Sequence, residues 1–335
     1  MSVILAIESS CDETGVAVIR NGREVLSNVV ASQIDIHKVY GGVVPEIASR
    51  QHTRAIVEVA TEALAEAGVR HPGKPDSTGL DLDAVAATNG PGLMGSLLVG
   101  VCFAKSLARV WGLPFIPVHH IEGHLFSVFI GDRAPEWPFL ALVVSGGHTQ
   151  LVRCDAPQQY ALLGATRDDA VGESFDKVAR LLDLPYPGGP SIQRAAEGGN
   201  PGAFDFPRAL RSHDSLEFSY SGLKTAVLYA LRDGGGPPAD LAASFQEAAI
   251  DTLVIKTRQA VEQTGLRQVA LVGGVAANRL LRERLGALEG VEVFMPEFKY
   301  CMDNAAMIGA AAHALFEAGV RGDSRTVPSP GLPLV

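Results

Sequence analysis

Cysteine is scarce in this chain, and its few copies lie far apart. The 335 residues include four cysteines, and no two of them form a CxxC pair. Disulfide frameworks need several cysteines at recurring spacings, so we expect a reduced, cytoplasmic protein. The four are Cys11, Cys102, Cys154 and Cys301.

A secretion signal and a membrane span are also lacking. The sequence runs from Met1 directly into a predicted strand, without a basic segment, an apolar signal region or a cleavage site. Its longest apolar runs are shorter than the roughly 20 residues that a transmembrane helix needs. We therefore expect no membrane association.

Positive charge is in deficit. The chain has 28 Lys and Arg against 37 Asp and Glu, a net charge of -9. A nucleic-acid-binding surface would normally be basic, so any RNA site must be a local patch or belong to a partner. The densest basic cluster is Arg279, Arg282 and Arg284.

Apolar residues and glycine are abundant in this chain. Hydrophobic residues make up 47% of the chain, and there are 36 glycines, which suits a globular protein large enough for two domains. Residues 140–152, LALVVSGGHTQLV, read as strand, glycine turn and strand. Gly146 and Gly147 can adopt backbone angles closed to other residues and can bring their N–H groups close to an anion. A plain hairpin is the alternative.

A second segment repeats this plan. Residues 3–20, VILAIESSCDETGVAVIR, form an apolar strand, a small polar turn and another apolar strand. The two hairpins suggest an internal duplication, although the segments share little sequence. Strands and helices alternate through the rest of the chain, which predicts an α/β protein. We place a domain boundary near residues 134–138, where two prolines and a tryptophan occur.

Two further segments could bind ligands. Gly273 and Gly274 follow a predicted strand and precede a helix that opens near Asn278, an arrangement that can bind an anion or simply connect the two elements. His120 and His124 are four residues apart, so on a helix both imidazoles could bind one metal ion, or could merely be packed or solvated. Glu122 is misplaced for the H-E-x-x-H motif of zinc proteases, which disfavours that mechanism.

Ten segments carry a resemblance over nearly the whole chain. In chain order they resemble the motifs of the bacterial TsaD family of tRNA N6-adenosine threonylcarbamoyltransferases, once called Gcp, YgjD or O-sialoglycoprotein endopeptidase. The segments are IESSCDETG, YGGVVPEIASRQH, NGPGLMGSLLVG, PVHHIEGHL, LVVSGGHTQLV, ESFDKVARLL, YPGGP, FSYSGLKTA, LVGGVAANR and CMDNAAMIG.

The resemblance implies a fold and an activity. The fold would be two duplicated actin-like α/β domains of the superfamily of actin, chaperone ATPases and sugar kinases (ASKHA, ribonuclease H-like) around a nucleotide cleft. We expect domains at residues 1–133 and 134–304, a helix at about 305–320 that packs back on the first, and a flexible tail at 327–335. The activity would be transfer of the threonylcarbamoyl group of threonylcarbamoyl-AMP to N6 of adenine at position 37, in tRNAs reading codons that begin with adenine, with release of AMP.

The resemblance also implies site residues. His120, His124 and Asp303 match the metal ligands of the family, for one divalent ion per subunit, Fe²⁺ in preference to Zn²⁺. Asp12 and Glu13 match an acidic pair near the acyl group, and Asp12 could orient groups, act as a base or merely cap a turn. The residues that match substrate and nucleotide contacts are Val143, Val144, Ser145, Gly146, Gly147, Asp176, Gly189 and Asn278.

Two positions depart from relatives of the family. Val143 stands where archaeal and eukaryotic relatives have a tyrosine metal ligand, so water or substrate would complete the coordination here. Gln193 stands where several bacterial relatives have an aspartate that contacts ribose. An amide is a weaker acceptor than a carboxylate, so we do not assign Gln193 to the site.

The resemblance implies partners as well. Besides tRNA, they are the paralogue TsaB and the ATPase TsaE, with TsaC supplying the acyl adenylate. Residues 92–110 or 119–129, both apolar, could offer a docking helix or belong to the core. Two other activities remain open from the fold alone, a sugar kinase and a nucleotide-dependent chaperone.

Overall fold

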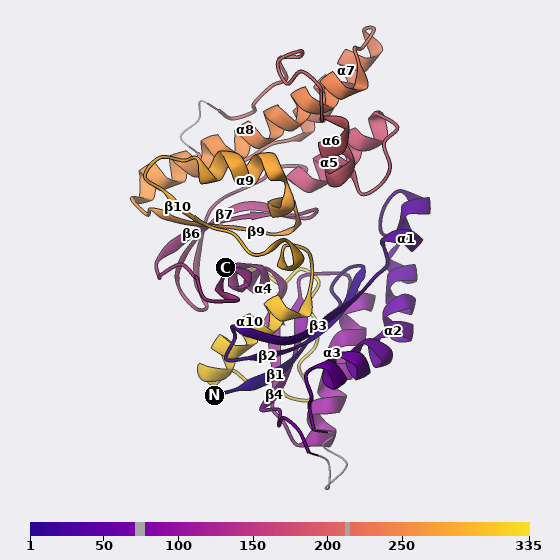
Figure 1. The fold of residues 1–335 in the computed structure, drawn as a ribbon, viewed down its shortest axis with the longest axis vertical. Coiled ribbons are helices and arrows are strands. Elements are labelled where there is room, and N and C mark those ends of the chain that lie inside the picture. The colour runs from indigo at the N-terminus through magenta and orange to yellow at the C-terminus, as the bar shows by residue number, and fades with distance from the viewer. Residues whose placement is uncertain (71–77, 212–214) are drawn as a thin grey trace. The chain divides into compact units, whose positions relative to one another are not determined.

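The computed structural model describes residues 1–70, 78–211 and 215–335, and these form two compact units (Figure 1). The first unit contains Met1–Ala134 and Pro296–Leu334, and the second contains Pro135–Met295 together with Val335. We expected the second domain to extend to residue 304. Residues 296–304 instead count with the first unit, because they lead directly into the last helix, which packs on the first sheet.

The first unit is built on a five-stranded mixed sheet with the order β3-β2-β1-β4-β5. The β1, β2 and β3 strands pair antiparallel, whereas β4 pairs parallel to β1 and β5 parallel to β4. All six residues of β1 are buried, as expected for a central strand covered on both faces. The strands are β1 (Val3–Glu8), β2 (Glu13–Arg20), β3 (Glu24–Ser32), β4 (Ala84–Gly90) and β5 (Phe115–His119).

Helices cover both faces of this sheet. Leu5 and Ile7 belong to a core cluster with residues of α2 and α3, whereas a side chain at Gly309 of α10 would collide with Ile19 and approach Ala6. Because successive side chains of a strand point to opposite faces, α2 and α3 cover one face and α10 the other (Figure 1). The helical elements are α1 (Ile34–His37), η1 (Lys38–Tyr40), α2 (Pro45–Glu66), α3 (Met94–Trp111), α4 (His120–Phe126), η2 (Ser127–Phe129), η4 (Phe298–Tyr300) and α10 (Ala305–Glu317).

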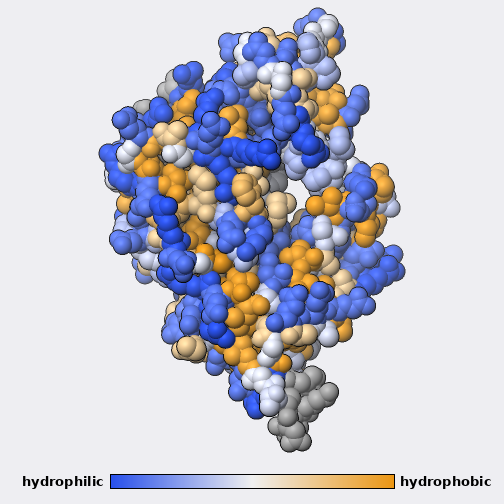
Figure 2. All heavy atoms as spheres, in the orientation of Figure 1, coloured by the Kyte–Doolittle hydropathy of each residue, from blue (hydrophilic) through white to orange (hydrophobic). Residues whose placement is uncertain are grey.

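The two helices that we considered for docking differ in exposure. All seven residues of α4 are buried, so the suggestion that this helix docks a partner is wrong. Met94, Leu98 and Val110 of α3 are exposed, and on the face drawn in Figure 2 hydrophobic residues lie in patches between hydrophilic ones. Within the described residues, α3 is also the one helix long and apolar enough to cross a membrane, a property that core helices share.

The second unit repeats the topology of the first. Its sheet has the order β10-β9-β6-β7-β8; β6, β7 and β8 pair antiparallel, and β9 and β10 extend the sheet in parallel. The predicted duplication and the α/β class are therefore confirmed. The strands are β6 (Phe139–Val144), β7 (Thr149–Ala156), β8 (Gln159–Ala165), β9 (Gln268–Val272) and β10 (Glu292–Phe294).

Helix starts in the second unit were predicted with mixed success. Asn278 caps α9 as expected, because its side chain accepts the Leu281 N–H at 3.0 Å. Asp168 lies just before α5, where an N-cap would be expected, but its carboxylate instead accepts the N–H groups of Tyr220 and Ser221, at the start of α7. The helical elements are α5 (Val171–Leu181), α6 (Gly188–Ala195), α7 (Ser221–Arg232), α8 (Pro238–Thr264), η3 (Gly274–Ala277) and α9 (Arg279–Gly286).

The carboxyl-terminal tail makes defined contacts. We expected residues 327–335 to be flexible, but the Ser329 N–H donates to the carbonyl of Asn89 at 2.8 Å, and the Gly92 N–H donates to Pro330 at 3.1 Å. These hydrogen bonds tie the tail to the turn between β4 and α3. Proline-rich segments cannot form a regular helix, but they can lie extended along a surface that supplies hydrogen-bonding groups.

Candidate functional site

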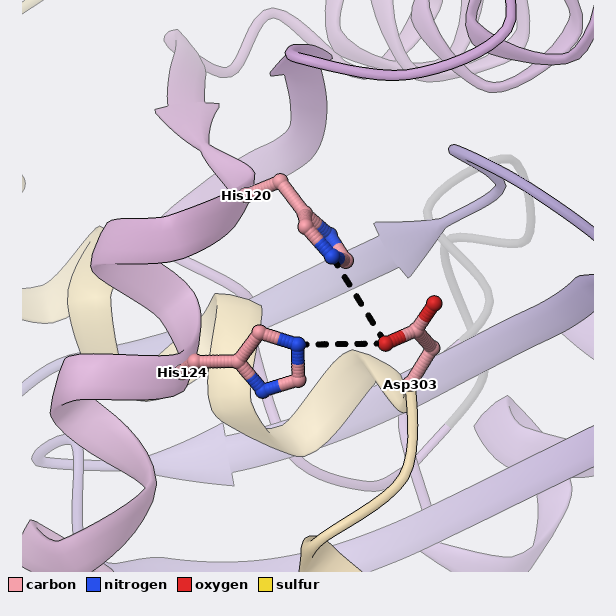
Figure 3. A group of neighbouring side chains, drawn as sticks. All are labelled: His120, His124 and Asp303. Carbon is pink, nitrogen blue, oxygen red and sulfur yellow. Dashed lines mark ion pairs between the residues drawn. The ribbon is translucent and has the colours of Figure 1, made fainter. Parts of the chain in front are cut away.

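Three potential metal ligands converge in the first unit. The Nε2 atom of His124 lies 3.2 Å from Oδ1 of Asp303, and Nε2 of His120 lies 3.6 Å from the same oxygen (Figure 3). One ligand atom from each residue lies within 4.8 Å of the others. The structure thus brings together the three residues that the sequence suggested as metal ligands.

Local sequence explains why these side chains meet. His120 begins α4, and His124 follows four residues later on the same face, with the two rings 4.8 Å apart. Asn304 caps α10 by accepting the N–H of Met307 at 3.1 Å, which holds the preceding Asp303 at the start of that helix. Two helix starts, separated by about half of the chain, therefore supply the ligands.

Glu8 contacts one of the candidate metal ligands, and the sequence analysis did not single it out. Its Oε2 lies 3.1 Å from Nδ1 of His120 and accepts a hydrogen bond from Thr88 at 2.7 Å, and its side chain is fully buried. A carboxylate on the outer nitrogen of an imidazole fixes the tautomer that leaves Nε2 free to bind metal. The available signal was an acidic residue at the end of an otherwise apolar strand.

Buried charge shifts the pKa values of this pair. Burial alone would raise the pKa of Glu8, but the neighbouring His120 holds it below its usual value. Burial alone would lower the pKa of His120, whereas Asp303 and Glu8 raise it to about 9. The two carboxylates therefore create a strongly negative environment around the imidazole, which favours a bound cation.

The donor set fits a divalent metal ion. Neither ring nitrogen of His124 makes a hydrogen bond within the described part of the chain, although both are buried and Nε2 lies close to Asp303. Buried polar atoms normally have partners, so such a nitrogen is suited to ligation. Two imidazoles and one carboxylate are ligands typical of Fe²⁺ and Zn²⁺ sites that keep open coordination positions.

Asp12 lies in the turn between β1 and β2, and Glu13 is the first residue of β2. Ser32 donates a 2.8 Å hydrogen bond to Oε1 of Glu13, while Oε2 is buried without a hydrogen-bond partner among the described residues. Burial raises the pKa of Glu13 to about 7 and raises that of Asp12 above its usual value. The backbone of the turn is held by His52, whose Nε2 lies 2.9 Å from the Cys11 carbonyl.

The glycine turn of the second unit lies between β6 and β7. The Ser145 N–H donates to the His148 carbonyl at 2.8 Å, which closes the turn. A Cβ added at Gly146 or Gly147 would meet no atom within 4 Å, and neither glycine has a positive φ. Our backbone-angle argument for these glycines was therefore wrong. They leave space beside the turn, and the buried side chains of Val143 and Val144 leave only backbone groups for a ligand.

The predicted Gly273 lies at the same end of this sheet, as does Gly172, which the sequence analysis did not single out. A Cβ at Gly172, the second residue of α5, would lie 2.6 Å from the Ser145 carbonyl, and one at Gly273 would lie 2.4 Å from that of Val144. Both glycines are needed for this close approach to the turn. The structure therefore brings the starts of α5 and η3 against residues 144–146, and α5 is held there because the N–H groups of Val171 and Gly172 donate to Thr149 Oγ1 at 2.8 Å and to the Ser145 carbonyl at 3.2 Å.

Asp176 and Asn278 hold the neighbouring loops, and Gly189 lies in one of them. Oδ1 of Asp176 accepts the N–H of Gly188 at 2.7 Å, while Gly189 beside it has open space at its Cβ position. The amide of Asn278 donates to Gln246 at 2.9 Å. Oε1 of Gln193 accepts the N–H of Arg279 at 2.8 Å, so this amide links α6 to the start of α9.

Comparisons with known proteins agree with this architecture. The chain is 51% identical over 341 residues to tRNA N6-adenosine threonylcarbamoyltransferase of Geobacillus thermodenitrificans, covering 99% of this chain and 97% of that protein. It is 53% identical over 329 residues to the protein of the same name from Salinibacter ruber, covering 95% of each.

Solved structures confirm the actin-like fold at low sequence identity. Full-length HypF, in its phosphate- and nucleotide-bound form, matches with a TM-score of 0.63 and 14% identity over 95% of this chain and 46% of HypF. Component A of Acidaminococcus fermentans (R)-2-hydroxyglutaryl-CoA dehydratase matches with a TM-score of 0.54 and 16% identity, over 96% and 100% of the two chains. The sequence profile of TsaD, tRNA N6-adenosine threonylcarbamoyltransferase, matches residues 24–310, and the chain therefore belongs to the TsaD family.

Proposed function

We propose that this chain transfers a threonylcarbamoyl group from threonylcarbamoyl-AMP to N6 of adenine 37 in tRNA. In this reaction the amine nitrogen forms a bond to the carbamoyl carbon, the bond from that carbon to the phosphate oxygen breaks, and AMP leaves. A base accepts the proton that the amine loses. The observation that carries the proposal is membership of the TsaD family, with about 50% identity over nearly the full chain. The same observation favours the transferase over a sugar kinase or a chaperone.

We infer that His120, His124 and Asp303 hold one divalent metal ion, Fe²⁺ in preference to Zn²⁺. The convergence of their ligand atoms supports this assignment, as do the buried nitrogens of His124, which make no hydrogen bond among the described residues. When bound, the ion would act as a Lewis acid toward the phosphate or carbonyl oxygen of the acyl adenylate. Glu8 would orient the His120 ring, and water or substrate would complete the coordination, because Val143 carries no ligand atom.

The second unit would bind the nucleotide part of the substrate. The turn of residues 145–147 lies next to open space, and a phosphate there would take over the N–H of Gly147, which donates to Oγ of Ser145 at 3.3 Å. Asp176, Gly189 and Asn278 would form the nucleoside side of this site. Two of these side chains already hold backbone N–H groups, Asp176 that of Gly188 and Asn278 that of Leu281, so part of their role would be to keep the loops in place.

Asp12 would accept or orient the proton of the attacking amine. Burial raises the pKa of this carboxyl group, which makes its ionised form a stronger base. Glu13 beside it, with a pKa of about 7, can carry a proton near neutral pH. Burial raises the pKa of both carboxyl groups, and the pair could therefore divide the tasks of accepting and holding protons.

Other proteins would be required for turnover. A chain with a net charge of -9 gains little affinity for tRNA from the release of counterions. The family resemblance points to TsaB and TsaE as partners and to TsaC as the source of the acyl adenylate, in the cytoplasm and away from membranes. The exposed apolar residues of α3, such as Leu98 and Val110, provide a surface that a partner could cover.

The activity can be tested by reconstitution. The chain is mixed with threonine, bicarbonate, ATP, unmodified tRNA and the three partner proteins, and tRNA nucleosides are analysed by mass spectrometry. We expect threonylcarbamoyladenosine with the full mixture and its loss with Asp12→Asn. The matched control is Asp233→Asn, at an exposed carboxylate next to Arg232.

Two outcomes would overturn the proposal or its partner requirement. The absence of modified adenosine from the complete mixture would contradict the transferase function. Multiple turnovers by the chain alone at physiological salt would contradict the dependence on partners, and tight binding of tRNA by the isolated chain would point the same way.

A further inference from the structure

The tail of the first unit reaches the helix that carries the metal histidines. After the hydrogen bonds at Ser329 and Pro330, the tail continues to Leu332, whose carbonyl lies 3.1 Å from Nε2 of His119. The approach at the β4–α3 turn is close, since a Cβ at Gly90 would lie 2.0 Å from the Ser329 carbonyl. The tail therefore packs closely against the β4–α3 turn, where Gly90 has no side chain.

His119 links the tail to α4 through its two ring nitrogens. Nδ1 accepts the N–H of Ile121 at 3.1 Å, which makes His119 the N-cap of α4. Because Nδ1 accepts a hydrogen bond from the backbone, Nε2 must carry the ring proton and donates it to the Leu332 carbonyl. The tail thus holds the imidazole in the tautomer and orientation that cap the helix.

We propose that the carboxyl-terminal tail positions the metal ligands through His119. The proposal rests on the proposed function in one respect, namely that His120 and His124 bind a metal ion. His119 is a positioning residue, since it does not belong to the ligand cluster. Its neighbour His120 is the first residue of α4, and His124 lies one turn further on.

Because α4 is short, the cap that His119 provides has a large effect on where the helix starts. The helix has seven residues, so the side-chain cap at its first turn is a large part of what fixes its start. Ligand atoms must be held to within a few tenths of an ångström, and neighbours that orient ligands typically change metal affinity about 10–100-fold. A loosened cap would allow the His120 ring to turn away from Asp303.

Four variants separate the tail from the cap. A chain that ends at Gly331 lacks the Leu332 carbonyl but keeps the hydrogen bonds of Ser329 and Pro330, whereas a control chain that ends at Leu334 keeps all three. His119→Asn preserves an N-cap side chain that is too short to reach the tail, and His119→Ala removes both functions. The double change, His119→Asn in the chain ending at Gly331, tests whether both act through one hydrogen bond.

The affinity for Zn²⁺ is measured by competition with a chelator, and amide hydrogen exchange of residues 121–124 is measured in the metal-free chain. We expect the chain ending at Gly331 and His119→Asn each to bind Zn²⁺ about tenfold more weakly. The double change should add nothing, and His119→Ala should lose more. Exchange in α4 should be faster in the shortened chain than in the Leu334 control, with the melting temperature unchanged.

Equal Zn²⁺ affinity and equal exchange in the Gly331 and Leu334 chains would overturn the positioning role. Additive losses in the double change would overturn the path through His119. If the full chain bound no Zn²⁺ while shortening still accelerated exchange in α4, the metal site of the proposed function would fail and the positioning of α4 by the tail would stand.

Discussion

The two units have sheets of the same order and strand directions, yet their first hairpins carry opposite chemistry. In the first unit, β1 ends at Glu8 and β2 begins at Glu13, so acidic side chains flank the turn. In the second unit, the corresponding positions are Val144 and Thr149, and the turn between them contains bare glycines. A shared topology therefore presents charged side chains in one unit and backbone N–H groups in the other.

This difference suggests that the two duplicated units bind different ligands, a metal ion in the first and a phosphate in the second. A metal ion needs side-chain ligands, and those of the first unit come from α4 and from the segment before α10, with Glu8 behind them. A phosphate can be bound by backbone alone, which requires space and not side chains. The fold supplies equivalent turns, and the residues at their ends determine what each turn can bind.

The largest expected effect comes from removing a metal ligand of the first unit. We expect His124→Ala and Asp303→Ala each to lower Zn²⁺ affinity about 1000-fold, about 4 kcal/mol, because the ion loses one of three protein ligands. Elemental analysis and chelator competition measure the loss, with Asp205→Ala, at a fully exposed carboxylate, as control. Full metal content in either ligand variant would refute the three-residue site.

The buried acid of the first turn should make stability depend on pH. The pKa of Glu13 rises from 4.5 to about 7 on folding, so the parent chain should lose about 3 kcal/mol of stability as pH rises between these values. Glu13→Gln removes this loss. The variant should therefore match the parent at low pH and be more stable above pH 7.

Urea unfolding of the metal-free chain between about pH 4 and 8 tests this expectation. The exposed Glu24→Gln is the control, since this carboxylate is paired with Arg20 at the surface. A constant difference in unfolding free energy between Glu13→Gln and the parent across this range would show that Glu13 does not titrate as its burial requires.

Blocking the glycine turn should affect the second unit alone. The added side chain of Gly146→Val would occupy the open space beside the N–H groups, and we expect the affinity for AMP to fall about 100-fold, about 2.7 kcal/mol. Calorimetry on the chelator-treated chain removes any contribution of the metal. Gly222→Val, at another glycine with open space, is the control. Loss of bound metal in Gly146→Val would break the proposed division between the units.

The smallest expected effect concerns the residue behind the metal ligand. Glu8→Gln keeps the shape of the side chain but removes the charge that supports His120, so Zn²⁺ affinity should fall about tenfold. This loss should be much smaller than that of His124→Ala, and chelator competition should rank the two. An unchanged affinity would mean that Glu8 only fills the core.

Much of the fold followed from local pattern. The alternation of apolar strands and helices predicted both sheets, and the helix predicted to open near Asn278 does start there, with Asn278 as its cap. Asp168 lies just before α5 but does not cap it, because its acceptors are used by Tyr220 and Ser221, about 50 residues away. Sequence position alone does not show which of two nearby helices a carboxylate serves.

The sequence by itself determined the strands, the glycine turn and the spacing of His120 and His124, because hydrogen bonding and burial along a strand or helix follow patterns a few residues long. Only the tertiary structure decided that Glu8 supports His120, that Glu13 is buried with a raised pKa, and that the tail reaches His119. These contacts join segments far apart in the chain. Their partners depend on strand order and helix packing, which no local pattern contains.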